Sequence, residues 1–138
     1  YLQLMQSTNK EQSREREIAT ITRDLKLMAL EFKIPIIILS QLNRNAEGKR
    51  PTMADLRESG AIEQDSDNIF FLHEPNGQEK EKLVEDGVYN WQFFNTLERK
   101  ECTLSQLIIE KQRNGPVGTF DLVKVPKMMK FLEVDFNG

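Results

Sequence analysis

A short apolar run, Ile36 to Leu39, constrains the fold more than any other part of this sequence. Pro35 precedes the run and restricts the backbone at its start, and no polar residue interrupts the four positions that follow. An uninterrupted β-branched run of this length is typical of a strand that is covered on both faces of a parallel sheet. The sequence therefore predicts an α/β fold with a buried central strand at this position.

Two polar residues, Ser40 and Gln41, come directly after the predicted strand. Because α/β sheets place their ligands at the ends of parallel strands, a hydroxyl and an amide at this position indicate a binding site. The same two side chains can instead cap the strand or bond a neighbouring loop, and their position alone leaves both interpretations open.

Three motifs follow one another along the chain: SQLNR at residues 40–44, DLRESGAIEQDSD at residues 55–67 and KQRNGP at residues 111–116. With these motifs the chain resembles the DnaB-type replicative DNA helicase family, almost continuously over about the first seventy residues and again from about Leu104 to Leu122. The resemblance implies a partial RecA-like P-loop ATPase fold, with a central parallel sheet and an antiparallel edge hairpin.

Candidate residues for nucleotide chemistry lie in the first and third motifs. Gln41 can donate an amide hydrogen to a γ-phosphate oxygen and lose that bond after hydrolysis, and the resemblance makes it the γ-phosphate sensor. Lys111 and Arg113 stand two apart, so they share a strand face and can address one anion, although a surface pair would use the same residues. The resemblance implies that they act as an arginine finger, with Gln112 nearby, on the nucleotide of the adjacent subunit.

Candidate residues for DNA binding lie in the second motif. The resemblance implies that Arg57, Glu58 and Gly60 hold single-stranded DNA in a central channel, from a loop in which Gly60 lets the backbone come close to a phosphate. Glu58 would repel phosphate, so its contact is expected through the backbone N–H. The alternative for Arg57 and Glu58 is an exposed ion pair of little energetic weight. Other residues of the motif are expected to fix this loop: Glu63, Gln64, Asp65 and Asp67.

Two parts of a nucleotide site are missing from the 138 residues. No phosphate-binding loop of the form G-x-x-x-x-G-K-[ST] occurs, and the chain starts at Tyr1, which in the helicase family directly follows a magnesium-binding aspartate. We therefore expect residues 1–138 to be the C-terminal part of a RecA-like helicase ATPase domain. ATP and Mg²⁺ would bind to the intact parent, and the fragment alone would turn over no ATP.

The composition restricts the kind of protein further. Nineteen basic against 22 acidic side chains give a net charge of -3, so any DNA contact has to be local. Cys102 and His73 are the single cysteine and histidine, which offers no zinc cluster or nucleophilic triad and suits a reducing cytosol. The apolar run from Ile34 to Leu39 is too short to span a bilayer. We expect a cytoplasmic protein of bacterial or phage origin, without a membrane partner.

The resemblance also implies the assembly and the partners of the parent protein. A finger that acts on a neighbour requires a head-to-tail ring, here a homo-hexamer, on single-stranded DNA, with primase and a helicase loader as further partners. Two alternatives stay open: another RecA-type ATPase such as a recombinase, and a standalone non-enzymatic module that binds DNA or protein. A strand-exchange assay on the parent tests the first alternative, and the residues encoded before Tyr1 test the second.

Helical spacing and caps predict one long helix near the start of the chain. It begins at Thr8 or at Ser13, both of which are suitable caps. Its apolar residues recur at steps of three and four and form a stripe expected to face the sheet: Ile18, Ile21, Leu25, Met28 and Phe32. The loop from Asn43 to Thr52 carries basic residues that stay in solvent or touch DNA: Arg44, Lys49 and Arg50.

The second half of the chain predicts mostly strands. Apolar runs predict three of them, the last two joined as an antiparallel hairpin by the turn Asn114-Gly115-Pro116: Asn68–Leu72, Leu104–Lys111 and Val117–Val125. Tyr89, Trp91 and Phe93 alternate with polar residues and predict a strand whose aromatic face packs in the core or stacks bases.

Overall fold

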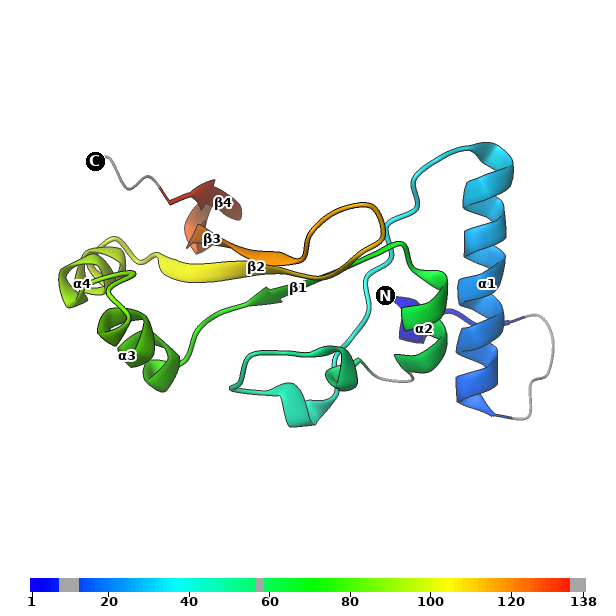
Figure 1. Ribbon diagram of the computed structural model, residues 1–138, viewed down its shortest axis with the longest axis horizontal. Coiled ribbons are helices and arrows are strands. Elements are labelled where there is room, and N and C mark those ends of the chain that lie inside the picture. The colour runs from blue at the N-terminus through cyan, green and yellow to red at the C-terminus, as the bar shows by residue number, and fades with distance from the viewer. Residues whose placement is uncertain (8–12, 57–58, 135–138) are drawn as a thin grey trace. The chain divides into compact units, whose positions relative to one another are not determined.

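The computed structural model describes residues 1–7, 13–56 and 59–134 (Figure 1). The chain divides into two compact units. The N-terminal unit comprises Tyr1–Glu47 and Thr52–Ile69, and the C-terminal unit comprises Gly48–Pro51 and Phe70–Gly138. Within the part of the chain that is described, no helix has the length and apolar character needed to cross a membrane.

The long helix α1 of the N-terminal unit runs from Arg14 to Phe32. Ser13 caps it, because its hydroxyl oxygen accepts a hydrogen bond from the backbone N–H of Arg16. The helix ends at Lys33, which adopts a left-handed conformation with φ of 53°. The predicted start at Ser13 is confirmed, and the alternative start at Thr8 lies outside the described residues.

The apolar stripe of α1 is buried only in its first half. Ile18 and Ile21 are buried, whereas Phe32 is 63% exposed. Helix α1 packs against a second helix, α2 (Ser59–Asp65), which has only seven residues against nineteen in α1. The prediction that the whole stripe faces a sheet is therefore wrong.

The segment predicted as the central strand, Ile36–Leu39, forms no strand. Ile37 is 91% exposed and Leu39 is 73% exposed. Its backbone contact with the start of the chain is a hydrogen bond from the N–H of Leu2 to the carbonyl of Leu39, 2.7 Å long. A strand needs hydrogen-bonded neighbours along its edges. The expected central parallel sheet is accordingly not found among the described residues, and the fold is α/β in the coarser sense.

The sheet contains four strands in the order β1-β2-β3-β4. Their bounds are Asn68–His73, Thr103–Gln112, Gly118–Val125 and Lys130–Glu133. Strands β2 and β3 pair antiparallel from Thr103↔Lys124 to Ile109↔Gly118, and β4 adds to β3 in the same sense. The predicted hairpin is confirmed. Strand β1 alternates between exposed and buried positions, unlike the continuously buried run that was expected.

Two helices lie between β1 and β2: α3 (Gly77–Glu85) and α4 (Trp91–Arg99). The strand predicted around Tyr89, Trp91 and Phe93 is wrong, since the side chain of Asn90 accepts a bond from the N–H of Phe93 and starts a helix there. Tyr89 is buried and its ring stacks on Phe93 with 4.4 Å between centroids. Core packing is thus the use made of Tyr89, with Phe94, Leu97 and Leu104 in the same cluster.

Candidate functional site

Gln41 lies on an exposed stretch whose backbone is held from the start of the chain. Its N–H donates to Oε1 of Gln3 (3.0 Å), and Nε2 of Gln3 donates to the Gln41 carbonyl (3.3 Å) and to the Ser40 hydroxyl (2.9 Å). Gln3 therefore pairs with this backbone much as a neighbouring strand would. The main chain of Gln41 is fixed while the residue stays accessible to a ligand.

A backbone bridge closes the loop that follows Gln41. Leu42 and Leu56 form an isolated antiparallel bridge, and the N–H of Asn43 donates to the carbonyl of Asp55 over 2.8 Å. The buried carboxylate of Asp55 also accepts bonds from both the N–H and the hydroxyl of Thr52, each 2.9 Å long. The bridge thus joins the residue after Gln41 to the last residue before the second motif's Arg-Glu pair.

Of the candidate DNA-binding residues, Arg57 and Glu58 lie outside the described residues. Gly60 is the second residue of α2, so its expected place in a loop is wrong. It is exposed, and a Cβ built there would meet no other described residue within 4 Å. The backbone at Gly60 is therefore open to close approach by another molecule.

Two acidic residues of the same motif, at the end of α2 and just after it, contact α1. Asp65 accepts a hydrogen bond of 2.9 Å from the hydroxyl of Thr22, which is buried. Asp67 forms an ion pair with Lys26. These contacts hold the helix that begins beside the Arg57-Glu58 pair, in agreement with a structural role for this end of the motif.

The candidate finger residues lie at the turn that joins β2 to β3. Lys111 and Gln112 are the last two residues of β2, and Arg113 is the first residue of the turn. Lys111 is partly buried and Arg113 is exposed. The amide of Gln112 lies against Gly115, where a Cβ would come within 2.7 Å of it. A side chain at Gly115 would displace that amide, which is the flexible end of the Gln112 side chain.

The structure thus brings the candidates together in two places. Gln41 and Gly60 belong to the N-terminal unit, on either side of the bridged loop. Lys111, Gln112 and Arg113 belong to the C-terminal unit, at one end of the hairpin.

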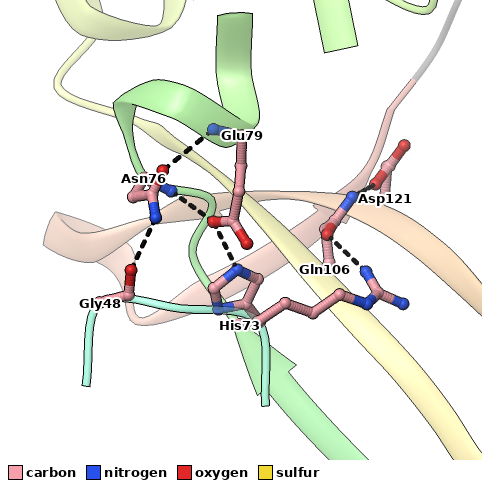
Figure 2. Close-up of polar contacts among 7 residues, drawn as sticks. Gly48, His73, Asn76, Glu79, Gln106 and Asp121 are labelled. Atoms are coloured by element: carbon pink, nitrogen blue, oxygen red, sulfur yellow. Dashed lines mark hydrogen bonds and ion pairs between the residues drawn. The ribbon is translucent and has the colours of Figure 1, made fainter. Parts of the chain in front are cut away.

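A polar cluster that sequence reasoning missed surrounds Glu79 (Figure 2). Its Oε2 accepts bonds from the N–H of Asn76 (2.8 Å) and from Nε2 of the buried His73 (2.9 Å). Asn76 in turn donates through Nδ2 to the carbonyl of Gly48, 2.6 Å away. Burial alone would raise the pKa of Glu79, but the bonds from Asn76 and His73, and then the backbone N–H of Arg50, together hold that pKa below its usual value.

A second polar chain crosses the hairpin. Gln106 donates through Nε2 to Oδ1 of Asp121 over 2.9 Å, and the hydroxyl of Tyr89 donates to Oδ2 of the same carboxylate over 2.8 Å. Burial and this bond raise the pKa of Tyr89 well above its usual range. The guanidinium of Arg50 donates hydrogen bonds to Gln106 and to Thr119. Arg50 was expected in solvent or on DNA, and the spacing of 56 residues between it and Gln106 offers no sequence signal for this contact.

Three of the candidate side chains are hydrogen-bond donors. The amide of Gln41, the ammonium of Lys111 and the guanidinium of Arg113 all present N–H groups, which match phosphate oxygens. They offer no carboxylate for Mg²⁺, and no group of three or more acidic, histidine or cysteine side chains among the described residues could hold a metal ion. Such N–H donors suit phosphate oxygens chemically, and the three side chains include no carboxylate that could bind Mg²⁺.

Comparison with known protein families supplies an independent indication. The family model described as the DnaB-like helicase C terminal domain matches residues 1–133. The chain is 44% identical over 137 residues to a probable replicative DNA helicase of Trieres chinensis, covering 96% of this chain and 27% of that protein. It is 40% identical over 139 residues to the replicative DNA helicase DnaB of Geobacillus stearothermophilus, covering 98% of this chain and 27% of that protein.

Two solved structures are similar to this chain along nearly its whole length. One is described as the structure of a DnaB-like replicative helicase and its interactions with primase. Its TM-score is 0.74 at 36% identity, with 98% of this chain and 29% of that chain covered. The other is described as an ATPase domain, with a TM-score of 0.72 at 36% identity, covering 98% of this chain and 43% of that one. The chain spans 27% of the length of the two helicases from Trieres chinensis and Geobacillus stearothermophilus.

Proposed function

We propose that the parent of this chain, which belongs to the family of DnaB-like helicase C-terminal domains, is a replicative DNA helicase. The parent would couple ATP hydrolysis to movement along single-stranded DNA and to unwinding of the duplex. In this proposal the chain is the C-terminal part of a RecA-like ATPase domain. It carries residues that read the nucleotide and residues that hold DNA, and it hydrolyses no ATP by itself.

The finer fold follows from the same proposal. In a complete RecA-like P-loop domain, Ile36–Leu39 would have hydrogen-bonded neighbours along its edges and would form a central parallel strand. The exposure of Ile37 and Leu39 supports this, because such apolar surface favours burial against further sheet and helix.

ATP hydrolysis divides between residues of two subunits. Attack of water breaks the bond between the γ-phosphorus and the oxygen that leaves with ADP, and charge spreads over the γ-phosphate oxygens. Gln41 would donate its amide hydrogen to one of these oxygens within its own subunit. Lys111 and Arg113 of the next subunit would supply positive charge as that transition state forms, with Gln112 beside them. Mg²⁺, when bound, would neutralise the β- and γ-phosphates.

DNA would be held by the second motif. Arg57 would pair with a phosphate, and Glu58 and Gly60 would offer backbone contacts. The open surroundings of Gly60 support such an approach.

The observation that carries the proposal is the bridge between Leu42 and Leu56. Loss of the bond between Gln41 and the γ-phosphate after hydrolysis would alter the start of the bridged loop. The far side of the bridge leads directly into the candidate DNA-binding residues. A change in nucleotide would therefore reach the DNA contact through one backbone pairing.

The resemblance to the known helicases extends the proposal to partners and place of action. A homo-hexameric ring would provide the subunit contacts that the finger needs, with primase and a helicase loader as further partners. The relative solved with primase supports the primase partnership. The parent would act in the cytoplasm of a bacterial or phage-infected cell.

Replacing the sensor in the full-length parent tests this proposal. Gln41→Ala should retain ATP binding, but the affinity for single-stranded DNA should no longer differ between an ATP analogue and ADP, because the amide that distinguishes them is gone. Fluorescence anisotropy of labelled DNA at low salt measures this affinity. The matched control is Gln78→Ala, an exposed glutamine of α3, which should keep the wild-type difference. A Gln41→Ala protein that still switches its DNA affinity would refute the role of Gln41.

A further inference from the structure

The guanidinium of Arg50 ties the two strands of the hairpin together. Nη1 donates to Oε1 of Gln106 on β2 over 3.1 Å, and Nη2 donates to the hydroxyl of Thr119 on β3 over 2.7 Å. The guanidinium of Arg50 is thus held by two acceptors, which argues against a role as a mobile DNA contact.

The strand register determines which face of the hairpin Arg50 contacts. Gln106 pairs with Asp121, and Ile108 pairs with Thr119, so Gln106 and Thr119 lie on one face of the two strands. Lys111 is five residues beyond Gln106 on β2 and therefore points to the opposite face. Arg50 therefore contacts the hairpin on the face opposite to Lys111 and does not cover the Lys111 face.

The hydrogen bonds of Arg50 belong to a longer chain of hydrogen bonds. Gln106 is only 8% exposed. Its Nε2 donates a hydrogen bond to Asp121, whose carboxylate also accepts a hydrogen bond from the hydroxyl of Tyr89. Removing Arg50 would leave the buried Oε1 of Gln106 without this donor, and neighbouring bonds in such a network weaken together. The hairpin would then lose a defined position relative to the loop that carries Arg50.

That loop begins next to the nucleotide sensor. Residues 48–51 belong to the C-terminal unit, whereas the chain on either side of them belongs to the N-terminal unit. The flanking residues Asn43 and Asp55 are hydrogen-bonded to each other, just after Gln41. Within the C-terminal unit, residues 48–51 are held on the hairpin that carries the finger through the guanidinium of Arg50.

We propose that Arg50 is a positioning residue that holds the β2–β3 hairpin, and with it Lys111 and Arg113, in the geometry needed to act on the neighbouring subunit's nucleotide. This inference rests on the finger role proposed above. An arginine suits it because one planar fork donates to two acceptors at fixed angles, which a lysine ammonium does not reproduce. Misplacing a catalytic group by about 1 Å can cost about a hundredfold in rate.

The test uses the full-length parent and steady-state ATP hydrolysis with saturating single-stranded DNA. Arg50→Ala should lower kcat by about tenfold to a hundredfold with KM for ATP nearly unchanged. Thr119→Val, which removes one acceptor, should lower kcat less, and the double variant should be no slower than Arg50→Ala because both remove the same contact. Arg50→Lys should restore little. The matched control, Arg99→Ala at the exposed end of α4, should behave as wild type.

A second measurement separates positioning from a general loss of folded protein. Arg50→Ala should weaken the binding of ADP with aluminium fluoride, a transition-state mimic that needs the finger, and leave binding of ADP with beryllium fluoride unchanged. Equal weakening of both complexes would mean that Arg50 only supports the fold, and would overturn the inference. If Arg50→Ala fails to assemble, Thr119→Val carries the same comparison, because it removes only one hydroxyl.

Parallel assays of Arg113→Ala distinguish the finger role of Arg113 from the positioning role of Arg50. A protein with Arg113→Ala that keeps full turnover would overturn the finger role and, with it, this inference. Loss of turnover in Arg113→Ala together with wild-type kcat in Arg50→Ala and Thr119→Val would overturn the positioning role alone. Loss of turnover in all three, with the transition-state complex selectively weakened, is the expected result.

Discussion

The carboxylate of Glu79 accepts hydrogen bonds from two separate parts of the C-terminal unit: the backbone N–H of Asn76 at the start of α3 and Nε2 of the buried His73 at the end of β1. The backbone N–H of Arg50 adds a smaller lowering of its pKa. Each of these donors favours the charged form of the carboxylate. A single side chain thus joins the first turn of α3 and the end of β1.

This arrangement predicts how stability depends on pH. The folded pKa of Glu79 lies below its usual 4.5, so the unfolded chain takes up a proton before the folded chain does. Its contribution to stability is complete above the unfolded value and is lost as the pH falls through the folded value. In urea denaturation, Glu79→Gln should be less stable than wild type at about pH 7, and the difference should shrink by about pH 3.

A matched glutamate on the same helix provides the control. Glu81 is exposed on α3, so Glu81→Gln should match wild type at both pH values. A stability difference for Glu79→Gln that stays constant from about pH 7 to about pH 3 would show that the carboxylate charge contributes nothing.

Among the helices and strands, those whose formation depends on residues close in sequence could be predicted. Ser13 and the helical spacing after it predicted α1, and the turn Asn114-Gly115-Pro116 predicted the β2–β3 hairpin. Both depend on hydrogen bonds between residues close in sequence. The candidate residues Gln41, Lys111 and Arg113 could also be singled out from the sequence, because each lies in a motif of contiguous residues.

Elements that depend on distant partners could not be predicted in this way. Ile36–Leu39 has the composition of a strand, but strand formation requires a neighbouring backbone that the segment itself does not contain. The contact between Arg50 and Gln106 joins residues 56 positions apart, with no pattern in between. Around Trp91, alternating aromatics suggested a strand, and the decisive signal was the helix cap at Asn90.

The cap at Asn90 gives a prediction for α4. Asn90→Ala should lower the free energy of unfolding by about 1 kcal/mol, because the N–H of Phe93 loses its acceptor, and Asn90→Ser should recover most of the loss. Fluorescence of Trp91, the single tryptophan, follows unfolding of this helix directly. The control is Asn95→Ala on the exposed side of α4, which should cost little. Equal costs at Asn90 and Asn95 would rule out the cap as the determinant.

At the scale of the whole molecule, the proposed chemistry belongs to an assembly. Gln41 would act on the nucleotide of its own subunit, while Lys111 and Arg113 would act on the nucleotide of a neighbour. In a head-to-tail ring each subunit gives its finger to one neighbour and receives a finger from the other. Every complete active site then lies between two copies of the chain.

Mixed rings of the full-length parent test whether the finger acts in trans. Arg113→Ala should leave ATP binding mostly intact and reduce turnover by about a thousandfold, the scale on which arginine fingers act. A second variant carries a disabled phosphate loop and an intact Arg113. Neither variant hydrolyses ATP alone, but in mixed rings an intact finger faces an intact pocket at some interfaces.

The account predicts that mixing the two inactive variants restores ATPase activity in proportion to those interfaces. A finger that acts within its own subunit cannot be rescued in this way, because every subunit in the mixture has lost either its finger or its pocket. If mixed rings assemble and remain inactive, while control rings doped with wild-type subunits hydrolyse ATP, then Lys111 and Arg113 do not act in trans.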